Sequence, residues 1–166
     1  MKKGIYTGLM LASLTFGGAL TTVVSTPDTT VQAKSVLKKT FKVGKTATYK
    51  GVSLKVNNFK YIEPGEYDLA DDGNQFIVVN VTIKNKSRKS YDYNALYFKL
   101  NVNGNNKDMD AFPDSVSDLL ESGTLDKGGS VTGNLVGEIK PGTKNPKLKM
   151  NVDVLDNSKN ITFKLK

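Results

Sequence analysis

Six separate segments of this chain alternate apolar and polar residues one by one, and no other feature constrains the fold as strongly. In an extended strand, successive side chains point to opposite faces, so each segment has one apolar face and one polar face. Strands of this kind form antiparallel sheets, and two stacked sheets hide all the apolar faces together. We therefore expect an all-β, antiparallel β-sandwich. The alternating segments are residues 52–57, 77–84, 96–102, 131–139, 148–154 and 161–165.

Turn-forming residues separate the alternating segments, as a series of short strands requires. Glycine adopts positive φ and proline fixes φ, so both mark places where the chain reverses. One short helix is expected after Pro113, because Ser115 and Asp118 have the spacing of a capping box and Gly123 can end the helix. The turn signals are at residues 64–65, 72–74, 103–105, 127–129 and 141–142.

The N-terminal segment has the three parts of a secretory signal peptide. Lys2 and Lys3 precede a long uncharged stretch, and residues 31–33 (Val-Gln-Ala) place small side chains where a signal peptidase reads. We therefore expect a signal peptide over residues 1–33, with cleavage between Ala33 and Lys34. The alternative is an uncleaved membrane anchor, although several glycines make the segment weakly hydrophobic for a spanning helix. After cleavage, no stable membrane span is expected.

The predicted organisation of the exported chain is simple. Residues 34–40 are expected to form a flexible lead, and residues 41–166 a single domain. Such a protein would be secreted or extracellular, with at most a loose association with the cell envelope.

The residue types that the chain lacks exclude several chemistries. It contains neither cysteine nor histidine, so it cannot form a Ser-His-Asp triad, a thiolate nucleophile or an ordinary zinc site. The Gly44-Lys45-Thr46 run resembles the end of a phosphate-binding loop, but Lys39 stands where that loop needs its first glycine. No nucleic-acid recognition motif is present either. We expect no enzymatic activity, no cofactor and no nucleic-acid partner.

Lysines dominate the charge, with 24 Lys and Arg against 16 Asp and Glu, for a net charge of +8. A positive surface attracts polyanions through a field that salt screens. The expected partner is therefore an anionic cell-wall polymer or an extracellular protein. The alternative is that these lysines only prevent edge-to-edge pairing of sheets. The candidate polyanion-binding residues are Lys38, Lys39, Lys42 and Lys45 near the N-terminus, and Lys55, Lys84, Lys99, Lys149 and Lys164 on the polar side of strands.

Acidic residues gather in one expected loop between strands, and they raise a second possibility. Carboxylate oxygens are the ligands that Ca²⁺ prefers, so this loop is a candidate for a metal site. A carboxylate-based enzyme is a further alternative. The simplest reading is a solvated loop. The residues are Glu66, Asp68, Asp71 and Asp72.

Three stretches resemble the patterns of a family of secreted Gram-positive proteins and lipoproteins of unknown function. Residues 73–87 resemble its strand pattern G-x-x-F-V-x-V-x-V-x-V-x-N-x-S, and residues 97–104 resemble its next strand with the glycine that follows. Residues 123–133 resemble G-x-L-x-P-G-x-x-x-x-G, with Lys127 in place of the proline. The resemblance implies an immunoglobulin-like fold, similar to secreted mycobacterial antigens of the MPT63/MPB63 type, and it implies no catalytic residues. The chain lacks the lipobox cysteine of lipoprotein members, so the resemblance does not extend to membrane tethering.

These observations together predict a secreted, non-enzymatic, immunoglobulin-like binding module of the bacterial cell envelope or medium.

The signal peptide makes a direct prediction about the exported protein. Protein recovered from the medium should begin at Lys34, because the residues before it end in a signal peptidase site. N-terminal sequencing and intact mass measure this. Recovery of the protein with residues 1–33 still attached would contradict it.

Overall fold

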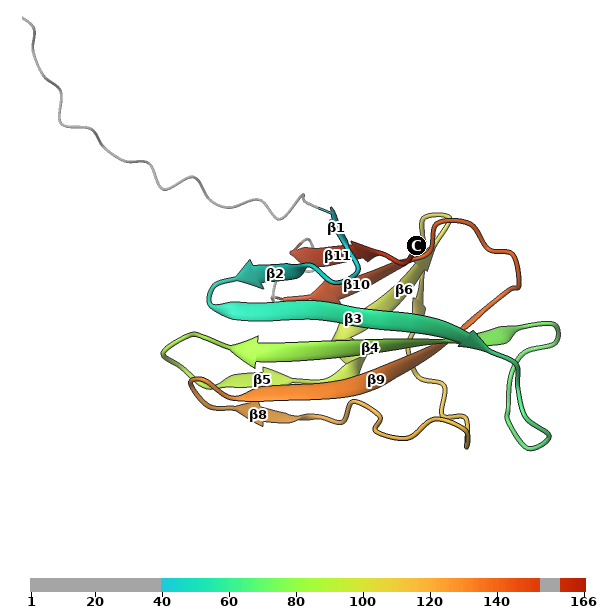
Figure 1. Ribbon diagram of the computed structural model, residues 1–166, viewed down its shortest axis with the longest axis horizontal. Coiled ribbons are helices and arrows are strands. Elements are labelled where there is room, and N and C mark those ends of the chain that lie inside the picture. Colours follow the sequence, from blue (N-terminus) through green and yellow to red (C-terminus); the bar gives the residue numbers. More distant parts are fainter. Residues whose placement is uncertain (1–39, 153–158) are drawn as a thin grey trace, which may run out of the picture. The chain divides into compact units, whose positions relative to one another are not determined.

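The structure is a computed structural model, which describes residues 40–152 and 159–166 (Figure 1). The expected signal peptide, its cleavage site between Ala33 and Lys34, and the candidate residues Lys38 and Lys39 lie outside the described residues. So does the expected lead except for Thr40, which is the first residue of a strand rather than the last residue of a lead.

Two sheets stack with their apolar faces together, which confirms the all-β, immunoglobulin-like sandwich. Nearly all neighbouring strands pair antiparallel, and among the described pairs only β1 lies parallel to its neighbour, β11. The five-stranded sheet has the order β1 (Thr40–Lys42), β11 (Asn160–Lys164), β10 (Lys147–Asn151), β6 (Phe98–Val102) and β7 (Asn105–Asp108). The four-stranded sheet has the order β2 (Thr46–Tyr49), β3 (Val52–Ile62), β4 (Gln75–Asn85) and β9 (Ser130–Ile139). A separate ribbon pairs β5 (Tyr91–Tyr93) with β8 (Gly123–Leu125).

The main core lies between the two sheets and is built from the apolar side of each alternating segment. Leu54 and Val79 from the four-stranded sheet and Phe98, Leu148 and Phe163 from the five-stranded sheet are fully buried in one cluster. Each large apolar side chain removed from water contributes about 1.5–3 kcal/mol. The burial of the inner faces leaves the polar side of each segment on the outside of the sandwich.

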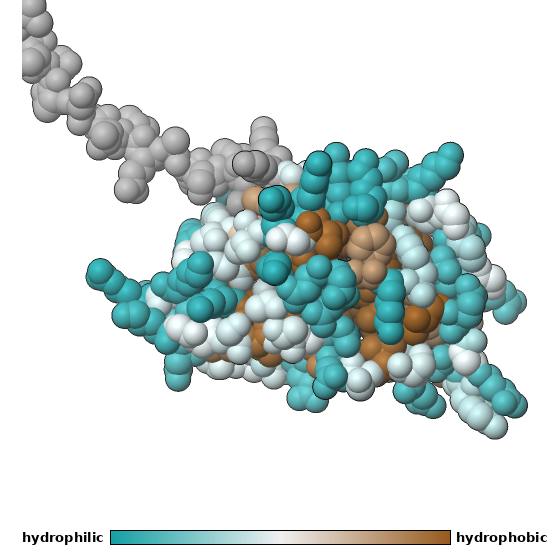
Figure 2. All heavy atoms as spheres, viewed as in Figure 1, coloured by the Kyte–Doolittle hydropathy of each residue, from teal (hydrophilic) through white to brown (hydrophobic). Residues whose placement is uncertain are grey.

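A second, smaller apolar cluster lies on the outer face of the four-stranded sheet. Phe76 and Val78 of β4 and Val136 of β9 are buried there, although they have the parity of the polar side. The segment that follows β7 covers them with Ala111, Val116 and Leu119. On the face seen in Figure 2, some apolar side chains reach the surface among hydrophilic ones.

The expected short helix, which would start at Ser115 and end at Gly123, is wrong. This segment instead runs beside β9, and its backbone groups bond to that strand. The Asn134 N–H donates to the Asp118 carbonyl at 2.8 Å, and the Leu120 N–H donates to the Asn134 carbonyl at 2.8 Å. Asp118 has φ of 53°, outside the helical region. Tertiary bonds to the edge strand therefore replace the helical bonds that a capping box would start.

The described residues contain a single helical element, a 3-10 turn at η1 (Ala95–Tyr97). The Asn94 side chain caps it by accepting from the Leu96 N–H at 2.8 Å.

Gly133 of β9 is where the covering segment comes closest to the sheet. A Cβ added there would lie 2.8 Å from the Leu120 Cα, which is backbone and cannot rotate away. We expect Gly133→Ala to lower the free energy of unfolding by about 1–3 kcal/mol, the usual cost of overpacking. Urea denaturation followed by circular dichroism measures the loss. Thr46→Ala, at an exposed position of β2, is the control and should change stability little. An equal loss in both variants would contradict the close-packing argument.

Candidate functional site

Five lysines share the outer surface of the five-stranded sheet, and we call this surface the lysine face. Their strand neighbours on the opposite parity, such as Leu148 and Phe163, are buried in the core, so the lysines point outward. The only acidic residue in the same cross-strand rows is Asp108. The lysine face consists of Lys42 of β1, Lys99 of β6, Lys147 and Lys149 of β10, and Lys164 of β11.

Strand register places these lysines directly opposite one another. Lys164 pairs in register with Lys42 on one side and with Lys147 on the other, so three consecutive strands carry lysine at one level. At the next level, Lys149 is opposite Lys99. Neighbouring strands lie about 4.8 Å apart, so the ammonium groups are concentrated on a small area.

Only part of the lysine face is neutralised by the protein itself. Lys99 forms an ion pair with Asp108 at the edge strand β7. The Lys149 ammonium donates to the Asn106 side-chain carbonyl at 3.1 Å. Within residues 40–152 and 159–166, Lys42, Lys147 and Lys164 have no acidic side chain within ion-pair distance. Among the described residues, four of the five positive charges therefore have no acidic partner, and one of the four, Lys149, is hydrogen-bonded to a neutral amide.

The structure divides the lysines that the sequence singled out. Lys42, Lys99, Lys149 and Lys164 come together on the lysine face. Lys55 and Lys84 instead lie on the outer face of the opposite sheet, and Lys45 lies in the turn between β1 and β2. Lys147 was missed, although its parity with Lys149 would have found it.

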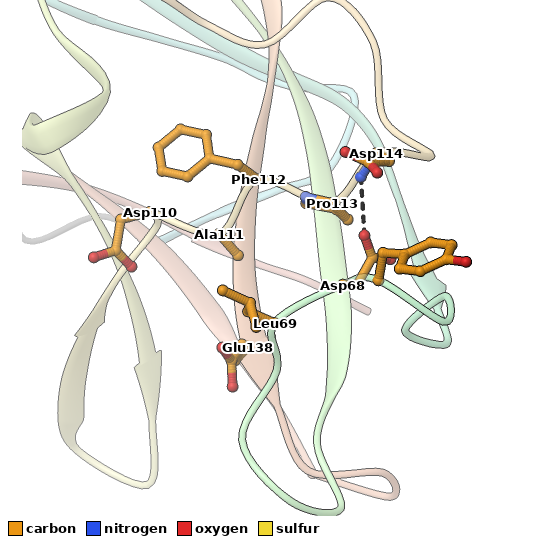
Figure 3. A pocket seen from close by; sticks show the side chains of 9 residues that line it. Asp68, Leu69, Asp110, Ala111, Phe112, Pro113, Asp114 and Glu138 are labelled. Carbon is orange, nitrogen blue, oxygen red and sulfur yellow. Dashed lines mark hydrogen bonds between the residues drawn. The ribbon is translucent and has the colours of Figure 1, made fainter.

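Hydrogen bonds to two carboxylates, one in the loop and one on β9, hold the acidic loop between β3 and β4 in place. One oxygen of Asp68 accepts the Gly65 N–H at 2.8 Å, and the other accepts the Asp114 N–H at 2.9 Å (Figure 3). Glu138 of β9 accepts the Asp71 N–H and the Asn74 side-chain amide, both at 2.9 Å. These bonds join the β3–β4 loop to β9 and to the segment after β7.

The structure adds no support for a metal site in this loop. Glu66, Asp71 and Asp72 are exposed, and Asp68 bonds to backbone amides. Across the described part of the chain, no three acidic side chains converge as a metal ion would require. The calcium hypothesis stays a prediction of the sequence.

Burial changes the acidity of two tyrosines. Desolvation raises the pKa of Tyr91 from 10.0 to about 12, with a smaller contribution from Tyr97, and desolvation also raises the pKa of Tyr61. Tyr91, Tyr93 and Tyr97 are partly buried against the main core. These three tyrosines therefore stabilise the domain by packing.

The fold and the lysine face define a small β-sandwich domain with a lysine-rich sheet surface. The chain belongs to the family described as domain of unknown function DUF4352, which matches residues 41–161. A search of the curated proteins finds no match. In the described residues, no helix has the length and apolar character needed to cross a bilayer.

Several solved structures share the fold. The yjhA protein of Bacillus subtilis has a TM-score of 0.60 at 23% identity, over 76% of this chain and 99% of that chain. The secreted protein MPT63 of Mycobacterium tuberculosis has a TM-score of 0.56 at 17% identity, over 76% of this chain and 96% of that chain. The ycdA protein of Bacillus subtilis has a TM-score of 0.64 at 24% identity over 73% of this chain, but the match spans only 38% of that longer protein. At these identities the likeness shows the fold alone.

The two bonds accepted by Asp68 predict a local effect of its removal. Asp68→Ala should lower the free energy of local opening at Asp114 by about 1 kcal/mol, because the Asp114 N–H loses its acceptor. Hydrogen exchange of the Asp114 amide measures it. Asp72→Ala, an exposed acidic residue of the same loop, is the control. Equal exchange rates of the Asp114 amide in both variants would contradict a stabilising bond from this amide to Asp68.

Proposed function

We propose that this protein is a secreted, non-enzymatic binding module that holds an anionic polymer of the cell envelope on its lysine face. The observation that carries the proposal is the row of Lys42, Lys164 and Lys147 in register on three neighbouring strands. The ligand class is a flexible chain of repeated phosphate or carboxylate groups.

The physical argument rests on repulsion within the lysine face. Like charges directly opposite one another on neighbouring strands destabilise a sheet. Solubility would be served as well by a surface on which both signs alternate. A polymer with regularly spaced anions relieves the repulsion at several lysines at once, and each added contact strengthens the binding of the chain as a whole. The arrangement therefore suits a repeating anionic ligand better than a single small anion.

Secretion and the absence of catalysis are parts of the same proposal. The N-terminal sequence has the pattern of a cleavable signal peptide, and the fold is shared with a secreted mycobacterial protein. The chain has no histidine or cysteine to act as a general base or nucleophile at neutral pH. A lysine-rich face outside the cell meets the anionic polymers of the envelope before any other abundant polyanion.

The test compares two triple variants that remove equal charge from opposite sheets. Lys42→Gln, Lys147→Gln and Lys164→Gln together should weaken binding to purified cell walls about 10- to 100-fold at low salt, if each contact contributes about 0.5–1 kcal/mol. Co-sedimentation with the walls over a salt series measures this, and salt should weaken wild-type binding. The control combines Lys55→Gln, Lys60→Gln and Lys84→Gln on the outer face of the four-stranded sheet.

The two triple variants distinguish a site from bulk charge. The control should bind within about twofold of wild type, because Lys55, Lys60 and Lys84 lie away from the lysine face. Equal losses in the two variants would show that net charge alone attracts the polymer. No retention of the wild-type protein at low salt would remove the proposal.

A further inference from the structure

The exposed apolar side chains gather at one place. Five large apolar residues of the described chain are exposed, and three of them, Tyr67, Leu69 and Phe112, line a single cavity of about 420 Å³. Phe112 also lines a smaller adjoining cavity together with a fourth, Leu96. Leu69 is 94% exposed and Phe112 is 74% exposed. Single exposed apolar residues are ordinary, but several that line one cavity are typical of an interaction site.

Acidic side chains surround this apolar group, and we call the cavity the acidic pocket. Asp68, Asp110, Asp114 and Glu138 line it, and none of the residues that line it is a lysine or an arginine. In Figure 3, the loop with Asp68 and Leu69 faces the segment from Asp110 to Asp114. In a chain of net charge +8, such a concentration of negative charge is a local exception to the overall charge. None of the residues of the lysine face lines the pocket.

The walls of the acidic pocket are held in place before any ligand arrives. The Asp114 N–H bond to Asp68 joins the two loops directly, and the Ala111 N–H donates to the Val136 carbonyl at 3.2 Å. Ala111 also packs on the small cluster around Phe76. The described residues offer no hydrogen-bond donor to the carboxylates of Asp110 and Asp114, on either side of Phe112. A ligand can therefore meet exposed apolar side chains on a backbone that is tethered by hydrogen bonds, beside two carboxylates that have no donor among the described residues.

We propose that the acidic pocket binds a basic, apolar peptide segment of a partner protein. Leucine- or phenylalanine-like side chains of the segment pack on Phe112, Leu69 and Tyr67. Lysines or arginines beside them pair with Asp110 and Asp114. Charge complementarity selects this occupant, since the carboxylates repel anionic polymers and anionic lipid surfaces. The proposal is independent of the lysine face and gives the domain two sites that attract opposite charges.

Selection from a random peptide library tests this proposal. The protein as secreted is immobilised, and peptides are selected from a phage-displayed library of random decapeptides. Peptides that combine Lys or Arg with Leu, Phe or Tyr should be enriched. A variant with Phe112→Ser and Leu69→Ser should enrich none of them, and one with Asp110→Asn and Asp114→Asn should lose the preference for basic residues. Enrichment of acidic or purely polar peptides, or of none, would overturn the proposal.

Fluorescence anisotropy with one enriched, labelled peptide then gives the affinities. Both pocket variants should bind it at least tenfold more weakly than wild type. The control, Glu121→Gln with Asp126→Asn, removes two exposed acidic side chains that do not line the pocket and should bind as wild type does. Equal weakening by control and pocket variants would contradict the site. The triple variant of the lysine face should bind the peptide normally, so failure of one proposal leaves the other intact.

Two other ligands of the acidic pocket, a second copy of the chain and a membrane, each have a separate test. Sedimentation velocity reports whether a second copy fills the pocket, in which case Phe112→Ser would dissociate an oligomer of the wild-type chain. Flotation with anionic phospholipid vesicles reports a membrane. Either result, if lost in the Phe112→Ser variant, would overturn the peptide proposal.

Discussion

Burial of the two inner sheet faces holds this domain together, and every surface feature depends on it. The chain has no cysteine, so no disulfide restrains the unfolded state, and the domain relies on packing. All but one of the largest fully buried side chains belong to the main core between the sheets; the exception is Phe76. Because alternation fills that core from one side of each strand, the other side can carry polar and charged side chains except where the Phe76 cluster is buried.

Edge strand β9 decides how the rest of the surface is arranged. It lies at the end of the four-stranded sheet, where an exposed edge would invite pairing with another chain. The segment after β7 covers that edge, with Gly133 giving it room to approach and Asn134 bonding to its backbone. The same segment carries Phe112 and Asp114 past the β3–β4 loop. The protection of one sheet edge thus also builds the acidic pocket.

The two proposed sites differ because the outer faces of the two sheets carry different residues. In the described residues, the outer face of the five-stranded sheet holds exposed or half-buried lysine at several cross-strand positions. The four-stranded sheet has part of its outer face covered by a segment rich in aspartate. The two proposals together assign one site for an anionic polymer and a second, separate site for a basic peptide.

Much of the fold could be predicted from local pattern alone. Alternation at residues 77–83 and 161–165 identified strands β4 and β11 and their buried sides, because the period of two is a property of the strand itself. The sequence missed the burial of Phe76, Val78 and Val136 on the other side of their strands. Those positions are buried by a segment far away in the chain, which no local period can report.

The sequence by itself determined the class of fold, the excess of lysine and the absence of histidine and cysteine chemistry. Only the tertiary structure decided which charges act together. Strand order and register brought Lys42, a residue near the start of the domain, beside Lys164 near its end, and separated both from Lys55 and Lys84. The tertiary structure also placed the segment that starts at Ser115, expected as a helix, along β9. The physical reason is that pairing between strands distant in sequence determines which lysines are neighbours. Local helix propensity is overridden where backbone groups form hydrogen bonds to another strand.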